Sequence, residues 1–332
     1  MAANGIGAGS NAETIAILHP GDMGAAVGAR LRDKRLRVLW SSAGRSRETR
    51  ERAALAGLED AGTLVAALRA STIALSICPP HAALAMAREV AAAKYRGVYV
   101  DANAVSPMTK REIERMLAAA GTKFVDGAII GPPPPAEGAG ARLYLSGRGA
   151  WRLARVLGSG SLSAVALEAP VGAAAALKVC FAAWNKNAIA LMAEILALAA
   201  LEDVEAPLMQ EWRRRMPDAL TSIERVPSSA RRAWRWVAEM EENAATFESA
   251  GLPAGASRAA AEAYRRLAAF RGAGEPPPLA EIVAALGARR EAKGKRREAA
   301  GAKSKAPGRK REARGTKRTA SARRRWTPQA RN

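Results

Sequence analysis

The chain has 332 residues, 49% of them hydrophobic, and it contains only two cysteines and two histidines. This length allows two domains with cores of their own, and two cysteines exclude a disulfide-stabilised secreted scaffold. The histidines and cysteines are not spaced like metal ligands, so no metal site is expected. Both cysteines lie in apolar segments and the N-terminus shows no secretory signal, so we expect a cytoplasmic protein.

The net charge of +21 is concentrated at the C-terminus. Residues 288–332 hold 18 of the 52 basic residues but 3 of the 31 acidic ones. From residue 291 onward large apolar side chains are almost absent, so this segment cannot bury a core. We therefore expect residues 291–332 to be a disordered basic tail, and the Gly/Ala/Asn-rich residues 1–13 to be disordered too.

The first half of the chain alternates short apolar runs with helical patterns. Strands are expected at residues 14–18, 36–40, 72–77, 98–101 and 123–126, with outer strands at 142–146 and 163–167. Helices are expected between them at residues 22–33, 47–56, 81–94 and 106–120. This alternation predicts an α/β fold, a Rossmann-type doubly wound parallel sheet, over residues 14–168.

From residue 169 the pattern changes to helices alone. They are expected at residues 172–201, 204–215, 217–223, 228–249, 254–270 and 278–290. We therefore predict an all-helical domain over residues 169–290. The first of these helices is apolar on nearly all faces and needs cover from outside its own domain, which predicts a homodimer through this half. Polar residues such as Asn185 and Glu194 argue against a membrane span.

A glycine-containing turn follows the first predicted strand. Dinucleotide-binding turns have the pattern G-x-G-x-x-G between a strand and a helix. Here the second and third glycines are Gly21 and Gly24, and His19 replaces the first. We expect this turn to bind the cofactor through His19, Pro20, Gly21, Asp22, Met23 and Gly24. The alternative is a tight turn with a purely structural role.

The end of the second predicted strand indicates which cofactor is bound. An Asp or Glu there favours NAD, but no acid lies between Leu36 and Arg47. Hydroxyl and guanidinium groups suit the 2′-phosphate of NADP instead. The expected cofactor is therefore NADP rather than NAD, and the residues proposed to bind it here are Ser41, Ser42, Arg45 and Ser46. The alternative is a solvated basic loop.

Four segments, taken in order, resemble the β-hydroxyacid dehydrogenase superfamily, which includes 3-hydroxyisobutyrate and 6-phosphogluconate dehydrogenases and to which imine reductases are related. They are the turn at residues 19–24, then Asp101–Pro107, Phe124–Pro132 and Gly172–Lys178. The resemblance covers residues 14–290. The residues that occupy these segments are similar to those of a subgroup with a distinct C-terminal helical domain. The resemblance implies the same fold, hydride transfer and a homodimer.

Lys178 corresponds to the catalytic lysine of that family. It opens a long apolar helix, and an isolated ammonium there is costly unless it has a function. Burial beside the cofactor would lower its pKa and suit it to acid/base catalysis of hydride transfer. The alternative from the residues alone is an interface lysine that extends its charge to solvent.

The segments depart from the family where substrate is bound. Asn103 and Ala104 replace the family's Ser-Thr, and Ala182 replaces its Asn after the lysine. We expect substrate contacts from Asn103, Ile130, Gly131, Pro132 and Asn185. Asn103 is also expected to contact the cofactor, although it or Ser106 could instead cap the helix at residue 106. The loop of Cys78, Pro79 and Pro80 is expected to line the cofactor's ribose side.

These features predict an NADP-dependent oxidoreductase acting on a small carbonyl, hydroxyl or imine substrate, with Lys178 as acid/base. A bulkier ketone, aldehyde or imine is favoured over a sugar acid because the family's polar contacts are missing. The competing hypothesis is a nucleic-acid- or polyanion-associated protein acting through the basic tail. One aromatic residue in that tail, Trp326, is too little for base stacking.

Overall fold

The computed structural model describes residues 13–138 and 140–287. These residues fall in one compact unit. The predicted basic tail and nearly all of the predicted N-terminal extension therefore lie outside the described residues, and so does the end of the helix predicted at 278–290.

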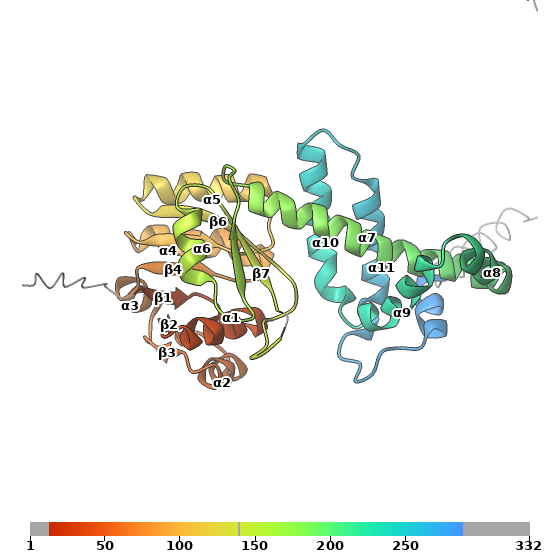
Figure 1. The fold of residues 1–332 in the computed structure, drawn as a ribbon, viewed down its shortest axis with the longest axis horizontal. Helices are drawn as coiled ribbons and strands as arrows, with labels where there is room; N and C mark the ends of the chain where they lie inside the picture. Colours follow the sequence, from red (N-terminus) through yellow and green to blue (C-terminus); the bar gives the residue numbers. More distant parts are fainter. Residues whose placement is uncertain (1–12, 139, 288–332) are drawn as a thin grey trace, which may run out of the picture. The chain divides into compact units, whose positions relative to one another are not determined.

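The first half forms a mixed sheet, shown in Figure 1. In the described part of the chain it has eight strands, in the order β3-β2-β1-β4-β5-β6-β7-β8. They are β1 (Thr14–Ile17), β2 (Arg37–Trp40), β3 (Glu59–Asp60), β4 (Ile73–Ser76), β5 (Val98–Asp101), β6 (Lys123–Ile130), β7 (Arg142–Ser146) and β8 (Ser163–Ala166). All neighbouring pairs are parallel except β6 and β7, which are antiparallel. The predicted doubly wound order is confirmed, but a fully parallel sheet is wrong at this edge.

Helices cover both faces of the sheet. One face packs against α1 (Asp22–Asp33), α2 (Arg47–Leu55) and α6 (Ala150–Leu157). The other packs against α3 (Leu64–Arg69), α4 (Ala83–Ala92) and α5 (Pro107–Ala119). Side chains of a strand point alternately to the two faces, so Ile15 and Ile17 join the first core while Ala16 and Leu18 join the second. This explains why the strands are continuous apolar runs.

Three short elements of this half were not predicted from the sequence. β3 is two charged residues long, α3 has six residues, and α6 has eight. Such elements are too short to show a periodic pattern, and β3 exists because Leu39 and Trp40 of β2 pair with it. The consequence is that Asp60 stands beside the end of β2.

The second half is helical, as predicted. Its helices are α7 (Ala173–Leu201), α8 (Glu205–Arg215), α9 (Asp218–Ala230), α10 (Ala233–Ser249) and α11 (Gly255–Leu267), and residues 279–287 are helical as well. The predicted break between residues 223 and 228 is wrong, because α9 continues through Pro227. An internal proline costs about 3 kcal/mol, but here Val226 and Ala230 on either side of it are buried in the helical core.

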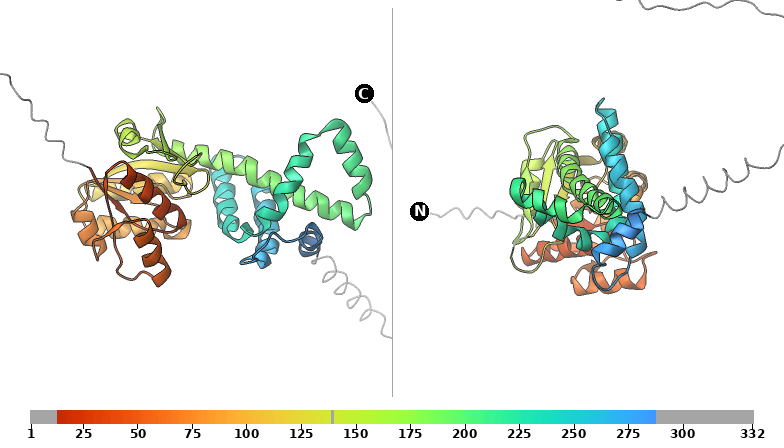
Figure 2. Two further views of the ribbon diagram at one scale, coloured as in Figure 1. Left: turned by 60° about the horizontal axis from the view of Figure 1, so that its bottom comes forward. Right: turned by 90° about the vertical axis from the view of Figure 1, so that its right-hand side faces the viewer.

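The long helix α7 connects the two halves. Its contacts include β6 on one side and α9 and α11 on the other, and Figure 2 shows it leaving the sheet and entering the helical half. By length and composition α7 is long and apolar enough to cross a membrane. Core helices of globular proteins share this property, and about half of α7's residues are exposed or half-buried.

Candidate active site

The turn after β1 is shaped for close approach of the backbone. A Cβ atom on Gly24 would lie 2.2 Å from the carbonyl oxygen of His19, so any other residue would push α1 away from the strand. Gly21 is the N-cap residue of α1, and no side chain caps the N-terminal amides of that helix. By contrast, Ser46 caps α2 and Ser106 caps α5. An uncapped helix start on a glycine turn fits the phosphates of a dinucleotide.

Arginines surround this turn. Arg45 donates to Nδ1 of His19 at 3.1 Å and to the carbonyl oxygen of Leu18 at 2.9 Å. Arg52 pairs with Asp22 at 3.1 Å and donates to the carbonyl oxygen of Pro20 at 3.4 Å. Burial and these two guanidinium groups lower the pKa of His19 below its usual value, so its imidazole is neutral at pH 7. Met23 is half-buried against the sheet core.

The predicted 2′-phosphate residues have mixed surroundings. Ser41 is buried, and Ser46 is engaged in capping α2. The backbone amide of Ser42 donates to Asp60 at 3.2 Å, and Arg50 donates to the carbonyl oxygen of Ser42 at 3.4 Å. Together with neighbouring residues, Ser42, Arg50 and Asp60 line a pocket of about 290 Å³ at the end of β2. A carboxylate, that of Asp60, therefore contacts the loop after β2, but it belongs to β3.

Asn103 joins the carboxyl ends of β4 and β5. Its Nδ2 donates to Ser76 Oγ at 3.0 Å and to Asp101 Oδ2 at 3.1 Å, and its Oδ1 accepts from the amide of Cys78 at 2.6 Å. The side chain is buried, and its hydrogen bonds hold the 78–80 loop against the 102–106 loop. Ser106 caps α5, so the capping alternative for Asn103 is wrong. Pro79 is exposed beyond Cys78, and Pro80 begins a short 3-10 turn.

A buried ion network lies directly below this edge. Lys110 of α5 is fully buried, with its amine 2.5 Å from Asp101 and 3.5 Å from Asp126. The amine also donates to the carbonyl oxygens of Asp101 at 2.6 Å and Gly127 at 3.0 Å. A charge buried this completely is tolerated only when it is paired and hydrogen-bonded. Sequence reasoning missed Lys110, although it shares a helix face with the buried Ile113 and Leu117.

Asp126 connects this network to α7. Its Oδ2 accepts hydrogen bonds from the amides of Gly172, Ala174 and Ala175 at 3.0, 3.1 and 3.2 Å, and from the hydroxyl of Ser146 at 2.9 Å. The carboxylate thus binds the positive end of the helix that carries Lys178. The position of that helix start is therefore set by the sheet.

Lys178 lies where α7, α10 and the loop after β5 meet. A small pocket encloses it, lined by Ala104, Val105, Ala175, Lys178, Val179, Glu239, Glu242 and Asn243. Ala104 and Val105 follow β5 directly, so the lysine stands at the carboxyl edge of the parallel strands, where α/β sheets bind ligands. Among the described residues, no hydrogen bond or ion pair to its amine is found. This is the location expected for the catalytic lysine.

The surroundings of Lys178 lower its pKa. Burial lowers its pKa from the usual 10.5 to about 8; the Glu239 carboxylate partly offsets this, while the Lys186 and Lys110 ammonium groups lower it further. The side chain is half-buried by exposed area, so part of it reaches the pocket while its amine is shielded by protein. A group with this pKa exchanges a proton readily near neutral pH.

Two carboxylates beside Lys178 were missed by sequence reasoning. Glu239 forms an ion pair with Lys186, whose amine also lies 5.1 Å from the Trp236 ring. Glu242 accepts from the amide of Ser106 at 3.1 Å and so holds α10 against the start of α5. The available signal was their spacing with Asn243, which puts all three on one helix face.

The remaining predicted residues lie outside the Lys178 pocket. Ile130, Gly131 and Pro132 follow one another at the end of β6, and Gly131 has a φ of +120°. Asn185 accepts a hydrogen bond from Arg225 of α9 instead of lining the pocket. No group of three or more potential metal ligands occurs within residues 13–138 and 140–287.

Comparisons with known proteins identify the fold. A domain of unknown function, DUF1932, matches residues 199–267. A conserved protein of unknown function, described as structurally similar to 3-hydroxyacid dehydrogenases, is 25% identical, with a TM-score of 0.61 over 77% of this chain and 98% of that chain. The chain has the fold of the 3-hydroxyacid dehydrogenases and carries a C-terminal helical DUF1932 domain. The resemblance read from the four segments is thereby confirmed.

Other relatives share the fold at lower identity or shorter length. The 3-hydroxyisobutyrate dehydrogenase of Mycobacterium tuberculosis is 19% identical, with a TM-score of 0.65 over 83% of this chain and 99% of that chain. Psf3 in complex with NADP+ and 2-OPP is 17% identical, with a TM-score of 0.56 over 82% of this chain and 100% of that chain. An uncharacterized 28.5 kDa protein of Methanothermus fervidus is 31% identical over 157 residues, which are 47% of this chain and 59% of that protein's length.

Proposed function

We propose that the protein is an NADP-dependent oxidoreductase that transfers hydride between the nicotinamide and a carbonyl, hydroxyl or imine carbon, with Lys178 as acid/base. The observation that carries this proposal is the Lys178 amine. It is shielded by protein, has no ion-pair partner in the described chain, and stands at the sheet edge with a pKa lowered to about 8. Perturbed lysines in such a place are typical of catalytic sites.

Different residues of the chain have different roles in this reaction. When bound, the nicotinamide would supply the hydride for reduction or take it up in oxidation. The turn around Gly21 and Gly24 holds the phosphates, and Lys178 donates a proton to the substrate oxygen or nitrogen during reduction, or accepts it during oxidation. Asn103 keeps the loops after β4 and β5 in place through Cys78 and Asp101.

The lining of the Lys178 pocket bears on the substrate class. Ala104, Val105 and Val179 are apolar, while Glu239 and Glu242 are acidic. Lys186 balances the charge of Glu239, whereas Glu242 has no ion-pair partner among the described residues and accepts only the Ser106 amide, so this wall disfavours an anionic substrate through one carboxylate. This supports a ketone, aldehyde or imine over a hydroxy acid.

The preference for NADP rests on Arg50, which contacts Ser42 after β2, and on Arg45 of the same loop, whose guanidinium contacts His19 and Leu18. Their guanidinium forks suit a 2′-phosphate. Asp60 opposes this preference, because its carboxylate lies beside Ser42. We expect the two arginines to outweigh one carboxylate that already accepts the amides of Ser42 and Gly62.

The decisive experiment measures cofactor binding before any substrate is known. NADPH and NADH are titrated into the protein while nicotinamide fluorescence is followed. We expect NADPH to bind at least about tenfold more tightly, as one charge-assisted phosphate contact provides. Tighter binding of NADH would contradict the choice of cofactor, and binding of neither would contradict the proposed function.

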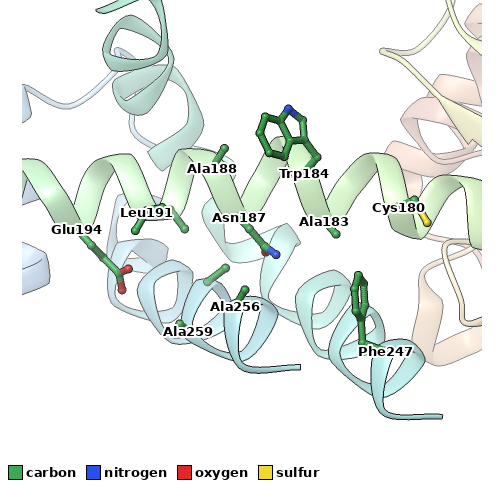
Figure 3. Close-up of a pocket in the computed structure, with 12 residues that line it drawn as sticks. Cys180, Ala183, Trp184, Asn187, Ala188, Leu191, Glu194, Phe247, Ala256 and Ala259 are labelled. Carbon is green, nitrogen blue, oxygen red and sulfur yellow. The ribbon is translucent and has the colours of Figure 1, made fainter. Parts of the chain in front are cut away.

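We also propose that a second copy of the chain covers the outer face of α7. Leu177, Phe181, Trp184, Leu191 and Leu198 recur along this helix at spacings of three, four or seven residues, and they are 36–82% exposed. Figure 3 shows the adjoining groove, where α7 side chains face Phe247 of α10 and Ala256 of α11. Its volume is about 540 Å³ and its lining is mainly apolar.

This spacing is that of a helix seam packed against another helix, and exposed apolar surface of this extent marks an interface. Light scattering coupled to size exclusion should therefore give twice the chain mass. Trp184→Glu should convert the protein to the monomeric mass, whereas Leu55→Glu, on a similarly exposed residue of α2, should not. A wild-type protein of monomeric mass would contradict the dimer.

Three further expectations stay predictions. Polyanion binding by the basic tail rests on residues outside the described range, and it is tested by removing residues 291–332, which should leave cofactor binding intact. A cytoplasmic location and the absence of membrane association rest on composition alone.

A further inference from the structure

The helical half contains a pocket lined by arginine. It lies where α9 ends and α10 begins, and residues 271–273 complete it. Arg231, Arg232, Arg235 and Arg271 line it together with Trp234, and its volume is about 480 Å³. Unlike the groove along α7, this pocket exposes polar as much as apolar surface.

The charge of this pocket is not balanced by its own walls. No acidic residue lines it in the described part of the chain. Arg271 and Arg235 lie 4.1 and 5.1 Å from the Trp234 ring, which holds two guanidinium groups near one another. Like charges gathered in this way repel, so the arrangement favours a ligand of opposite sign. Planar guanidinium groups are matched best by phosphate or carboxylate oxygens.

The pocket adjoins the cofactor turn. Arg235 lies 3.3 Å from Asp22, the first residue of α1, and Arg52 contacts the same carboxylate from α2. With Arg45 at His19, arginines from three separate segments contact the turn that holds dinucleotide phosphates in this fold. The helical half thus contributes positive charge beside the β1–α1 turn.

The Lys178 pocket and the arginine pocket are next to different loops of the sheet. The Lys178 pocket borders the loop after β5, whereas Arg235 contacts the turn after β1. In the sheet, β4 separates β1 from β5 by two strand spacings, about 10 Å, whereas on α10 Arg235 lies one helical turn, about 6 Å, from Glu239 of the Lys178 pocket. Its contact with Asp22 puts Arg235 beside the turn that holds dinucleotide phosphates in this fold.

We propose that the helical half binds the phosphate groups of the dinucleotide through Arg231, Arg232, Arg235 and Arg271. This inference rests on the proposed function, since it requires that the protein binds a dinucleotide. It adds a second set of contacts to those of the β1–α1 turn, so that cofactor binding needs both halves of the chain.

The test compares two double variants of the full chain that each lose two positive charges. Arg231→Ala/Arg232→Ala removes two arginines of the pocket, and Arg213→Ala/Arg214→Ala removes two from the exposed end of α8. By nicotinamide fluorescence, the first should raise the Kd for NADPH about tenfold or more, and the second less than twofold. Equal affinity in wild type and the first variant would overturn the inference while leaving the proposed function standing.

A further variant and a second ligand test the same inference independently. Arg271→Ala changes one exposed residue outside the helices and should weaken NADPH by about fivefold with an unchanged melting temperature. Inorganic pyrophosphate should compete with NADPH in the wild type and lose potency in both pocket variants. Pyrophosphate that binds together with saturating NADPH would assign the arginines to another phosphate ligand and overturn the inference. A wild type that binds no dinucleotide would overturn the proposed function as well.

Discussion

Lys110 and Lys178 are both enclosed by protein, but the two amines differ in their ion pairs and hydrogen bonds. Lys110 has no exposed surface, and it contacts two carboxylates and two carbonyl oxygens. Lys178 lies near Glu239, Lys186 and Lys110, but no ion pair or hydrogen bond to its amine is found among the described residues. The first arrangement keeps the charge and uses it for structure. The second lowers the pKa of the Lys178 amine, so that it can gain or lose a proton near neutral pH.

Replacing Lys178 should give the largest effect on function. Lys178→Met removes the acid/base group, so turnover of any identified substrate should fall by about 10²–10⁴-fold. Its stability should be unchanged or slightly higher, because no partner charge is left unpaired and a desolvated amine is removed. Steady-state rates and urea unfolding check this. A variant with full turnover would exclude lysine from the mechanism.

Replacing Lys110 should give the largest effect on stability. Lys110→Met leaves Asp101 and Asp126 buried without their counter-charge, which should lower the free energy of unfolding by about 3–5 kcal/mol. Urea unfolding followed by circular dichroism measures it. The control is Lys123→Met, on an exposed lysine at the start of β6, with an expected change within about 0.5 kcal/mol. Equal unfolding of both variants would show that the buried network is dispensable.

The pH dependence of catalysis should follow Lys178. Reduction needs the protonated amine, so kcat/KM for reduction should fall as pH rises through about 8. Oxidation needs the neutral amine and should rise over the same range. Glu239 raises the pKa of Lys178 and Lys186 lowers it, so Glu239→Gln should move the midpoint to lower pH and Lys186→Met to higher pH. Midpoints that move together in both variants would contradict the assignment.

The smallest effect is expected where the network meets α7. Ser146 donates to Asp126 at 2.9 Å and accepts from the amide of Ala174 at 3.1 Å. Ser146→Ala removes both bonds from a buried site and should lower the free energy of unfolding by about 1–2 kcal/mol, while turnover falls only slightly. Differential scanning calorimetry and steady-state rates measure both. A loss of turnover as large as for Lys178→Met would mean that the helix start takes part in catalysis.

Much of the fold could be predicted because its strands are buried on both sides. Apolar runs such as Thr14–Ile17 and Ile73–Ser76 stand out from the amphipathic helices between them. The helix through Pro227 could not be predicted, because its stability comes from tertiary packing that outweighs the local preference. The antiparallel step from β6 to β7 had a signal that sequence reasoning missed: no helix was expected between these strands, and a connection without a crossover helix returns the chain antiparallel to the strand before it.

The candidate site was predicted only in part. Lys178 was identified because one charge in an apolar helix is conspicuous. Lys110 and Glu239 lie among other charged residues, in Thr-Lys-Arg-Glu and Glu-Met-Glu-Glu, where a buried charge looks like an exposed one. Asp60 reaches the end of β2 from a neighbouring strand, so inspection of the β2 loop alone does not reveal it.

The hydrogen bonds between Asp126 and the start of α7 affect the direction of the whole helix. α7 is 29 residues long, and at the usual rise of a helix it measures about 43 Å. A tilt of about 5° at its root would move its far end by roughly 4 Å. The Asp126 carboxylate oxygen thus helps to set the direction in which α7 leaves the sheet, and a small change of direction there corresponds to a larger displacement at the far end of the helix.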